Sequence, residues 1–208
     1  MAQILMLVRH GDTGKQFADR YIGSTDIPLA EKGREQAVYL AGRIRREMPE
    51  SCLCSPLRRC IQTAKIISRP LRISPEIDPD LREIDFGNWE GLTFEDIARK
   101  DPAGVHRWAR FDPDFAFPEG ETIGEFLSRT RRVAARLRQM PEKTVLVSTH
   151  GGVIRMLICH YLGLSPRHYI LFRVLPGSLA TIELAGTKGV LTGLNETGTP
   201  EDFQAWEE

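Results

Sequence analysis

The chain has 208 residues, of which 41% are hydrophobic and 27% are charged, and this suits one globular domain with a buried core. Its formal net charge is zero and no apolar run approaches the ~20 residues of a membrane span, so neither nucleic acid nor a membrane is an expected partner. Four cysteines without a Cys-x-x-Cys pair provide no disulfide framework or zinc site, and the apolar stretch 4–8 is too short for a signal peptide, so we expect a cytoplasmic protein.

Strands and helices are predicted to alternate along most of the chain. Gln3–Val8 is a continuous apolar run, as expected of a strand buried on both faces, and apolar residues recur at helical spacing through Glu31–Met48. The further predicted elements are a strand at Ser51–Cys54, helices at Pro56–Ser68 and Thr122–Met140, a strand at Thr144–Ser148, a helix at Val153–Leu162, and closing strands at Leu179–Leu184 and Val190–Asn195. This alternation predicts an α/β sandwich with a largely parallel central sheet.

The stretch 75–121 interrupts the alternation, with five prolines and several acidic and aromatic residues. We interpret it as a lid-like insertion of short helices and loops over one end of the sheet, within a single domain that spans 1–208. An ordinary long connection is the alternative. In the lid interpretation, side chains such as Trp89, Trp108, Phe111 and Phe115 would set the specificity of the site.

Two predicted strands end in the same pattern. Val8 is followed by Arg9-His10-Gly11, and Thr149 is followed by His150-Gly151-Gly152. In open α/β sheets, ligands bind at the carboxyl ends of the strands, so we expect the two histidines to face one another there. The alternative is that each histidine only satisfies its own loop.

Arginines near these histidines favour a phosphate ligand. Arg9 precedes the first histidine, and Arg58 and Arg59 lie near the start of a predicted helix, whose N-terminal amides also attract anions. Neighbours on a helix point about 100° apart, so one of these two arginines is expected to face inward. Two histidines and two arginines suit a dianionic phosphate without a metal.

Motifs for other chemistries are absent from the sequence, which has no His-Glu-x-x-His, calcium loop, phosphate-binding loop or Gly-x-Ser-x-Gly. A histidine is then the best nucleophile on offer, and no cofactor is expected. Transfer of a phosphoryl group to histidine also needs a proton donor for the leaving alkoxide. Glu83, Asp85 and Glu90 lie among apolar neighbours, where burial and a nearby dianion raise a carboxyl pKa, and the pattern does not choose among them.

Five segments, in this order, resemble motifs of the histidine phosphatase superfamily, which includes cofactor-dependent phosphoglycerate mutases and many small phosphatases. The segments are Leu7-Val8-Arg9-His10-Gly11-Asp12-Thr13, 23–29, 55–64, 81–91 and 148–155. The resemblance covers nearly the whole chain. It implies a three-layer α/β/α sandwich with a largely parallel central sheet and a small insertion over the active site.

The resemblance also implies roles for single residues. His10 would be the nucleophile that becomes phosphohistidine, and Glu83 would protonate the leaving group and then activate water. The phosphoryl group would be held by Arg9, Arg59 and His150, which stabilise its transition state. Substrate contacts are expected from Thr13, Gln16, Gly23, Ser24 and Gly151. The chain departs from the family pattern at Asp12, where glutamate is usual, and at Gln16, where asparagine is usual.

The chain is shorter than the mutases of this family usually are, which favours a metal-independent phosphomonoester hydrolase that acts on a small phosphorylated metabolite. Segments 117–122, 172–184 and 191–195 resemble the α-ribazole phosphatase group of cobalamin assembly, so α-ribazole 5'-phosphate is the candidate substrate. The alternatives are a phosphoglycerate mutase, a broad sugar and acid phosphatase, and a non-catalytic binding protein. Apolar strand ends near the C-terminus leave room for a homodimer.

Overall fold

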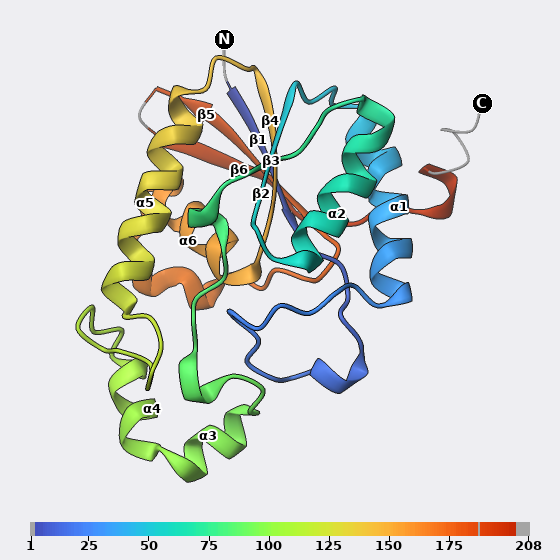
Figure 1. Ribbon diagram of the computed structural model, residues 1–208. Helices are drawn as coiled ribbons and strands as arrows, with labels where there is room; N and C mark the ends of the chain where they lie inside the picture. The colour runs from blue at the N-terminus through green and yellow to red at the C-terminus, as the bar shows by residue number, and fades with distance from the viewer. Residues whose placement is uncertain (1–2, 187, 203–208) are drawn as a thin grey trace.

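A mixed sheet forms the centre of the computed structural model, which describes residues 3–186 and 188–202 (Figure 1). The sheet has six strands in the order β3-β2-β4-β1-β5-β6. The strands are β1 (Gln3–Arg9), β2 (Ser51–Cys54), β3 (Glu76–Ile77), β4 (Thr144–Thr149), β5 (Leu179–Ala185) and β6 (Lys188–Glu196). The first four in the spatial order pair in parallel, and β5 and β6 are antiparallel. The predicted largely parallel sheet and closing strand pair are therefore confirmed.

Helices cover both faces of the sheet. They are α1 (Glu31–Arg45), α2 (Arg58–Ser68), α3 (Phe94–Lys100), α4 (Pro102–Ala109), α5 (Ile123–Gln139) and α6 (Gly151–Leu162). Helices α1 and α2 lie on one face and α5 and α6 on the other, while α3 and α4 lie beyond the end of the sheet at which β1 finishes (Figure 1). This arrangement is the predicted three-layer α/β/α sandwich. Within the described ranges, no helix is both long and apolar enough to cross a bilayer.

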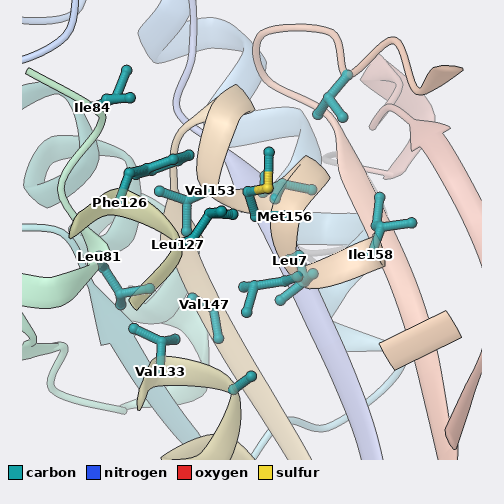
Figure 2. Packing of buried hydrophobic residues seen from close by; sticks show 14 of the residues in the cluster. Leu7, Leu81, Ile84, Phe126, Leu127, Val133, Val147, Val153, Met156 and Ile158 are labelled. Carbon is teal, nitrogen blue, oxygen red and sulfur yellow. The ribbon is translucent and has the colours of Figure 1, made fainter. Parts of the chain in front are cut away.

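The sheet separates two hydrophobic clusters, and β1 contributes to both. Successive side chains of a strand point to opposite faces, so Leu5 and Leu7 pack in the cluster beneath α5 and α6, whereas Met6 and Val8 pack in the cluster beneath α1 and α2. All four side chains are fully buried. Figure 2 shows the first cluster, in which Leu7 and Val147 of neighbouring strands lie near helix residues such as Val153 and Met156.

Several helices begin or end at residues other than those predicted. Helix α5 begins one residue after the predicted start because Thr122 caps it, forming a capping box with Glu125. Helix α1 ends at Arg45 rather than at Met48, whose φ of 49° is left-handed and whose side chain is exposed. Helix α6 begins at Gly151, two residues before the predicted start.

The stretch 75–121 holds β3, α3, α4 and the loops between them. Its aromatic side chains pack on one another, with Trp89 and Phe117 rings 5.2 Å apart and Phe115 and Phe117 rings 5.1 Å apart. These three residues are buried and belong to the cluster beneath α5 and α6. Of the side chains predicted to set specificity, Trp89 and Phe115 are therefore enclosed in the core, whereas Trp108 and Phe111 are only partly buried against the same cluster.

The two-cluster core predicts a large difference between otherwise identical substitutions in two strands. Val147→Ala, at a fully buried position of β4, should lower the free energy of unfolding by about 2 kcal/mol, because it removes two methyl groups and leaves a void. Val190→Ala, at a β6 position that is 60% exposed, should change it by less than ~0.5 kcal/mol. Chemical denaturation of both variants measures this, and equal losses would contradict the assigned burial.

Candidate active site

His10 is the first residue beyond β1, and its ring is held in one protonation form. Its Nδ1 lies 2.8 Å from the carbonyl oxygen of Gly11. A carbonyl only accepts hydrogen bonds, so Nδ1 carries the proton and Nε2 keeps a free lone pair. Burial lowers the pKa of His10 well below its usual value, and the nearby positive charges of Arg9 and Arg59 lower it further. The imidazole is therefore neutral near pH 7, with Nε2 available as a nucleophile.

His150 follows β4 at the same edge of the sheet. The parallel register aligns Arg9 with Thr149, so the next residue of each strand comes to the same level, and the two histidine rings are 5.2 Å apart at an angle of 66°. His150 is fully buried, with its Nε2 2.8 Å from the Ser55 hydroxyl oxygen. Burial, followed by the charge of Arg59, lowers its pKa well below the usual value. The structure thus brings the two predicted histidines together.

Two arginines point buried nitrogen atoms into this region. Arg59 is buried, and its terminal nitrogens donate to the carbonyl oxygens of Thr25 and Gly23, both at 2.7 Å. A terminal nitrogen of Arg9 donates to the carbonyl of Val174, also at 2.7 Å. In each guanidinium the buried Nε has no hydrogen-bond partner among the described residues. The positive charges of both arginines act on His10, as the lowering of its pKa shows, so this region favours an anion.

The structure separates the two adjacent arginines of α2, as the helical spacing predicts. Arg59 faces inward, whereas Arg58 is exposed. The backbone N–H of Arg58 donates to the carboxylate of Asp26 at 2.7 Å, which fixes the start of the helix.

Of the three carboxyl candidates, only Glu83 lines the same cavity as His10. Its carboxylate accepts hydrogen bonds from the backbone N–H of Gly152, at 2.9 Å, and of Ile84, at 3.1 Å. A Cβ at position 152 would overlap this carboxylate and displace it, so the glycine allows Glu83 to bind the start of α6. Asp85 and Glu90 instead accept hydrogen bonds from residues of the loop 23–25.

The cavity has a volume of about 530 Å³ and opens at the carboxyl end of β1. Its lining includes Arg9, His10, Thr13, Glu83 and Gly151. His150 and Arg59 lie outside the lining. His150 contacts the ring of His10, which does line the cavity.

Three predicted substrate contacts do not line this cavity. Gln16 is exposed. Gly23 and Ser24 belong to the loop that Glu90 holds, through hydrogen bonds of 2.9 Å from both of their backbone N–H groups. Gly23 touches the site indirectly, because its carbonyl accepts from Arg59.

Three further arginines line the cavity and were not among the predicted site residues, namely Arg20, Arg155 and Arg173. Arg155 lies one helical turn after Gly151 and donates from Nε to its carbonyl at 3.1 Å. The guanidinium of Arg155 lies 5.1 Å from the centre of the Tyr169 ring. The i, i+4 spacing from the glycine after His150 is the sequence signal that could have identified it.

A second cavity of about 300 Å³ adjoins the first, and the two share Tyr21, Phe86 and Arg155. Its other lining is mostly aromatic and aliphatic, including Trp108, Phe111, Phe117, Ile123, Phe126, Met156, Tyr169 and Ile170. A cavity lined by several arginines therefore opens beside an apolar, aromatic-lined space. Across the part of the chain that the structure describes, no three His, Cys, Asp or Glu side chains group so as to hold a metal ion.

The chain is similar in sequence to several known proteins. A bifunctional protein of Mycobacterium tuberculosis is 39% identical over 156 residues, which are 74% of this chain but only 43% of that protein, so the chain spans less than half of its length. Adenosylcobalamin/alpha-ribazole phosphatase of Escherichia coli is 31% identical over 193 residues, 92% of this chain and 95% of that one.

Solved structures extend the comparison. The structure of mycobacterial glucosyl-3-phosphoglycerate phosphatase superposes with a TM-score of 0.82 at 27% identity, covering 94% of this chain and 99% of that one. The family model of the histidine phosphatase superfamily, branch 1, matches residues 5–197. The resemblance found in the sequence motifs is thereby confirmed, and the chain belongs to the histidine phosphatase superfamily.

Proposed function

We propose that this protein hydrolyses phosphomonoesters through a phosphohistidine formed at Nε2 of His10, without a metal ion. The observation that carries the proposal is the neutral, buried His10, whose Nδ1 is bound to a carbonyl so that Nε2 is free, and whose ring lies close enough to Arg9 and Arg59 for both charges to lower its pKa. Phosphatase activity is also in the names of the relatives that match nearly the whole chain.

In the first step, Nε2 of His10 attacks phosphorus as the bond from phosphorus to the ester oxygen breaks. The arginine donors and His150 stabilise the charge that spreads over the phosphoryl oxygens. Glu83 gives its proton to the leaving alkoxide, so that an alcohol departs.

In the second step, the Glu83 carboxylate takes a proton from water, whose oxygen attacks the phosphohistidine. The bond from phosphorus to nitrogen breaks, and inorganic phosphate leaves. Glu83 is protonated again and His10 is neutral, so the cycle closes.

The two cavities favour a phosphate ester whose alcohol carries an aromatic ring. The aromatic-lined cavity adjoins the proposed phosphate site through Tyr21 and Phe86, and it would receive a planar, apolar group. α-Ribazole 5'-phosphate is of this kind, because its sugar carries a benzimidazole base. A second candidate class is favoured by Arg20, Arg155 and Arg173, which line the first cavity and would suit a substrate with a further carboxylate, such as glucosyl-3-phosphoglycerate.

Removal of the nucleophile should abolish turnover. His10→Ala should reduce phosphate release by at least about 10³-fold in the presence of EDTA, whereas His106→Ala, at an exposed position of α4, should leave it unchanged. Rapid quenching of the wild type should trap phosphate on His10. Activity that survives in a folded His10→Ala variant would contradict the phosphohistidine mechanism.

A substrate panel separates the two classes. We expect kcat/KM to be highest for α-ribazole 5'-phosphate, with lower values for glucosyl-3-phosphoglycerate, phosphoserine and 3-phosphoglycerate. Phe111→Ala opens the aromatic cavity and should raise KM for α-ribazole 5'-phosphate by about 10-fold with little effect on phosphoserine. A preference for the carboxylate-bearing esters would favour the second class instead, and conversion of 3-phosphoglycerate to its isomer would identify a mutase.

The lowered pKa of His10 predicts the acidic limb of the pH profile. Its folded-state pKa lies well below 6.5, so His10 stays neutral, and competent to attack, as the pH falls past 6.5. The acidic limb of kcat/KM should therefore lie well below pH 6.5. Arg59→Gln removes a neighbouring positive charge and should move this limb to higher pH by about one pH unit, while the exposed Arg58→Gln should not. An unmoved limb in Arg59→Gln would contradict the electrostatic cause.

A further inference from the structure

The segment 80–83, which ends in Glu83, has its backbone held by side chains from other parts of the fold. The guanidinium of Arg129, on α5, donates to the carbonyl oxygens of Asp80, at 2.8 Å, and Arg82, and to that of Glu83 at 3.0 Å. The fourth carbonyl, of Leu81, accepts from the hydroxyl of Thr149 at 2.7 Å. All four carbonyl groups of the segment are therefore fixed by donors outside it.

Arg129 is held in turn by a buried ion pair. Its side chain is 2% exposed, and its Nε and one terminal nitrogen donate to the two carboxylate oxygens of Glu121 at 2.7 Å and 2.8 Å. This is the two-pronged geometry that a guanidinium forms with a carboxylate. Together with the three carbonyl contacts, it uses all five N–H donors of the guanidinium.

Glu121 also ties the chain on the other side of Glu83. Its backbone N–H donates to the carbonyl of Asp85 at 3.0 Å, and its carboxylate accepts from the backbone N–H of Asp85 at 3.4 Å. The ion pair thus grips the backbone on both flanks of Glu83, in a stretch where no helix or strand fixes the residues 82–86.

We propose that Arg129 and Glu121 form a clamp that positions the Glu83 carboxylate for proton transfer to the leaving alcohol. The inference rests on the proposed function, which makes Glu83 the proton donor. Arg129 is a positioning residue in this account, because it touches the backbone of Glu83 and does not line the cavity that holds His10. A displacement of about 1 Å of a catalytic group can cost about 10²-fold in rate, so loosening this backbone should impair proton transfer.

The test compares two substrates that differ in their need for a proton. An alkyl phosphate releases a strongly basic alkoxide and needs the acid, whereas 4-nitrophenyl phosphate releases a stable phenolate without it. The ratio of the two kcat/KM values therefore reports proton donation, and a loss of folded protein alone lowers both values equally. Glu83→Gln is the reference, and it should lower the value for the alkyl ester by about 10²-fold or more and that for the nitrophenyl ester far less.

Arg129→Lys keeps the positive charge but has only three donors on one atom, and it should show the same selective loss in weaker form. We expect a 10- to 100-fold fall in kcat/KM for the alkyl ester, because a misplaced catalytic group can cost up to about 10²-fold in rate. The fall should be mainly in kcat, with KM changed less than about 3-fold. Glu121→Gln, which keeps the shape of the side chain, serves as the second variant should Arg129→Lys fail to fold. It should change the ratio in the same direction.

Arg132→Gln is the matched control. Arg132 lies on the same helix and contacts the same segment, but its side chain is 55% exposed and binds the carboxylate of Asp80 rather than a carbonyl group. Its removal should leave the ratio unchanged. Equal losses for both substrates in folded Arg129→Lys and Glu121→Gln, or no loss in either, would overturn the clamp.

Hydrogen exchange separates failure of the clamp from failure of the proposed function. Arg129→Lys should accelerate amide exchange in the segment 80–86 and leave α6 unchanged, whether or not the protein turns over any ester. Unchanged exchange in that segment would overturn the clamp, while an inactive wild type with accelerated exchange in the variant would overturn only the proposed function. A Glu83→Gln variant that loses both substrates equally would remove the role of Glu83 and the clamp with it.

Discussion

The parallel pairing of β1 with β4 is the constraint on which the rest of the site depends. Its register aligns Arg9 with Thr149. The histidines that follow these two residues, although distant in sequence, are therefore brought together with their rings in an edge-to-face arrangement. A slip by one residue would also exchange the two faces of β1, moving Leu7 and Val8 into the wrong clusters. The burial of hydrophobic side chains on both faces of the sheet therefore sets the spacing between the two imidazole rings.

The stretch 75–121 holds Arg59 and the backbone of Glu83 in place through separate contacts. Glu90 holds the loop 23–25 by accepting from its backbone N–H groups and from the Thr25 hydroxyl, and the carbonyl groups of that loop fix Arg59. Glu121, near the other end of the stretch, fixes Arg129 and thereby the backbone of Glu83. One segment thus orients both a cation and a carboxylate around the neutral histidine.

The buried strands and long helices could be predicted from the sequence because their signals are local. A strand covered on both faces is a continuous apolar run, as in β1 and β4, and α5 carries apolar residues at helical spacing together with its own cap. The strand β3 was not predicted because it has two residues, both exposed, and exists only through its pairing with β2.

The residues at the centre of the site were harder to predict, because tertiary contacts determine which of several candidate side chains lies there. Residue spacing did not distinguish Glu83, Asp85 and Glu90 as proton donors. The distinction depends on their contacts with Gly152 and with the loop 23–25, both of which are distant from them in sequence. Arg129 is one of several arginines on α5, and it is distinguished by tertiary contacts, namely its burial against Glu121 and its hydrogen bonds to the segment 80–83. The resemblance to known motifs supplied Glu83 and Arg59, whereas nothing in those motifs pointed to Arg129.

The orphaned Nε donors of Arg9 and Arg59 also bear on the energetics of the whole molecule. A buried donor without a partner costs about 1–3 kcal/mol of folding free energy, against a total stability of about 5–15 kcal/mol for a typical domain. An oxyanion that binds beside His10, where the charges of Arg9 and Arg59 act together, would bind only the folded state, and by mass action it would shift the folding equilibrium. With the proposed site occupied in this way, the conformational stability of the protein would depend on the oxyanion concentration around it.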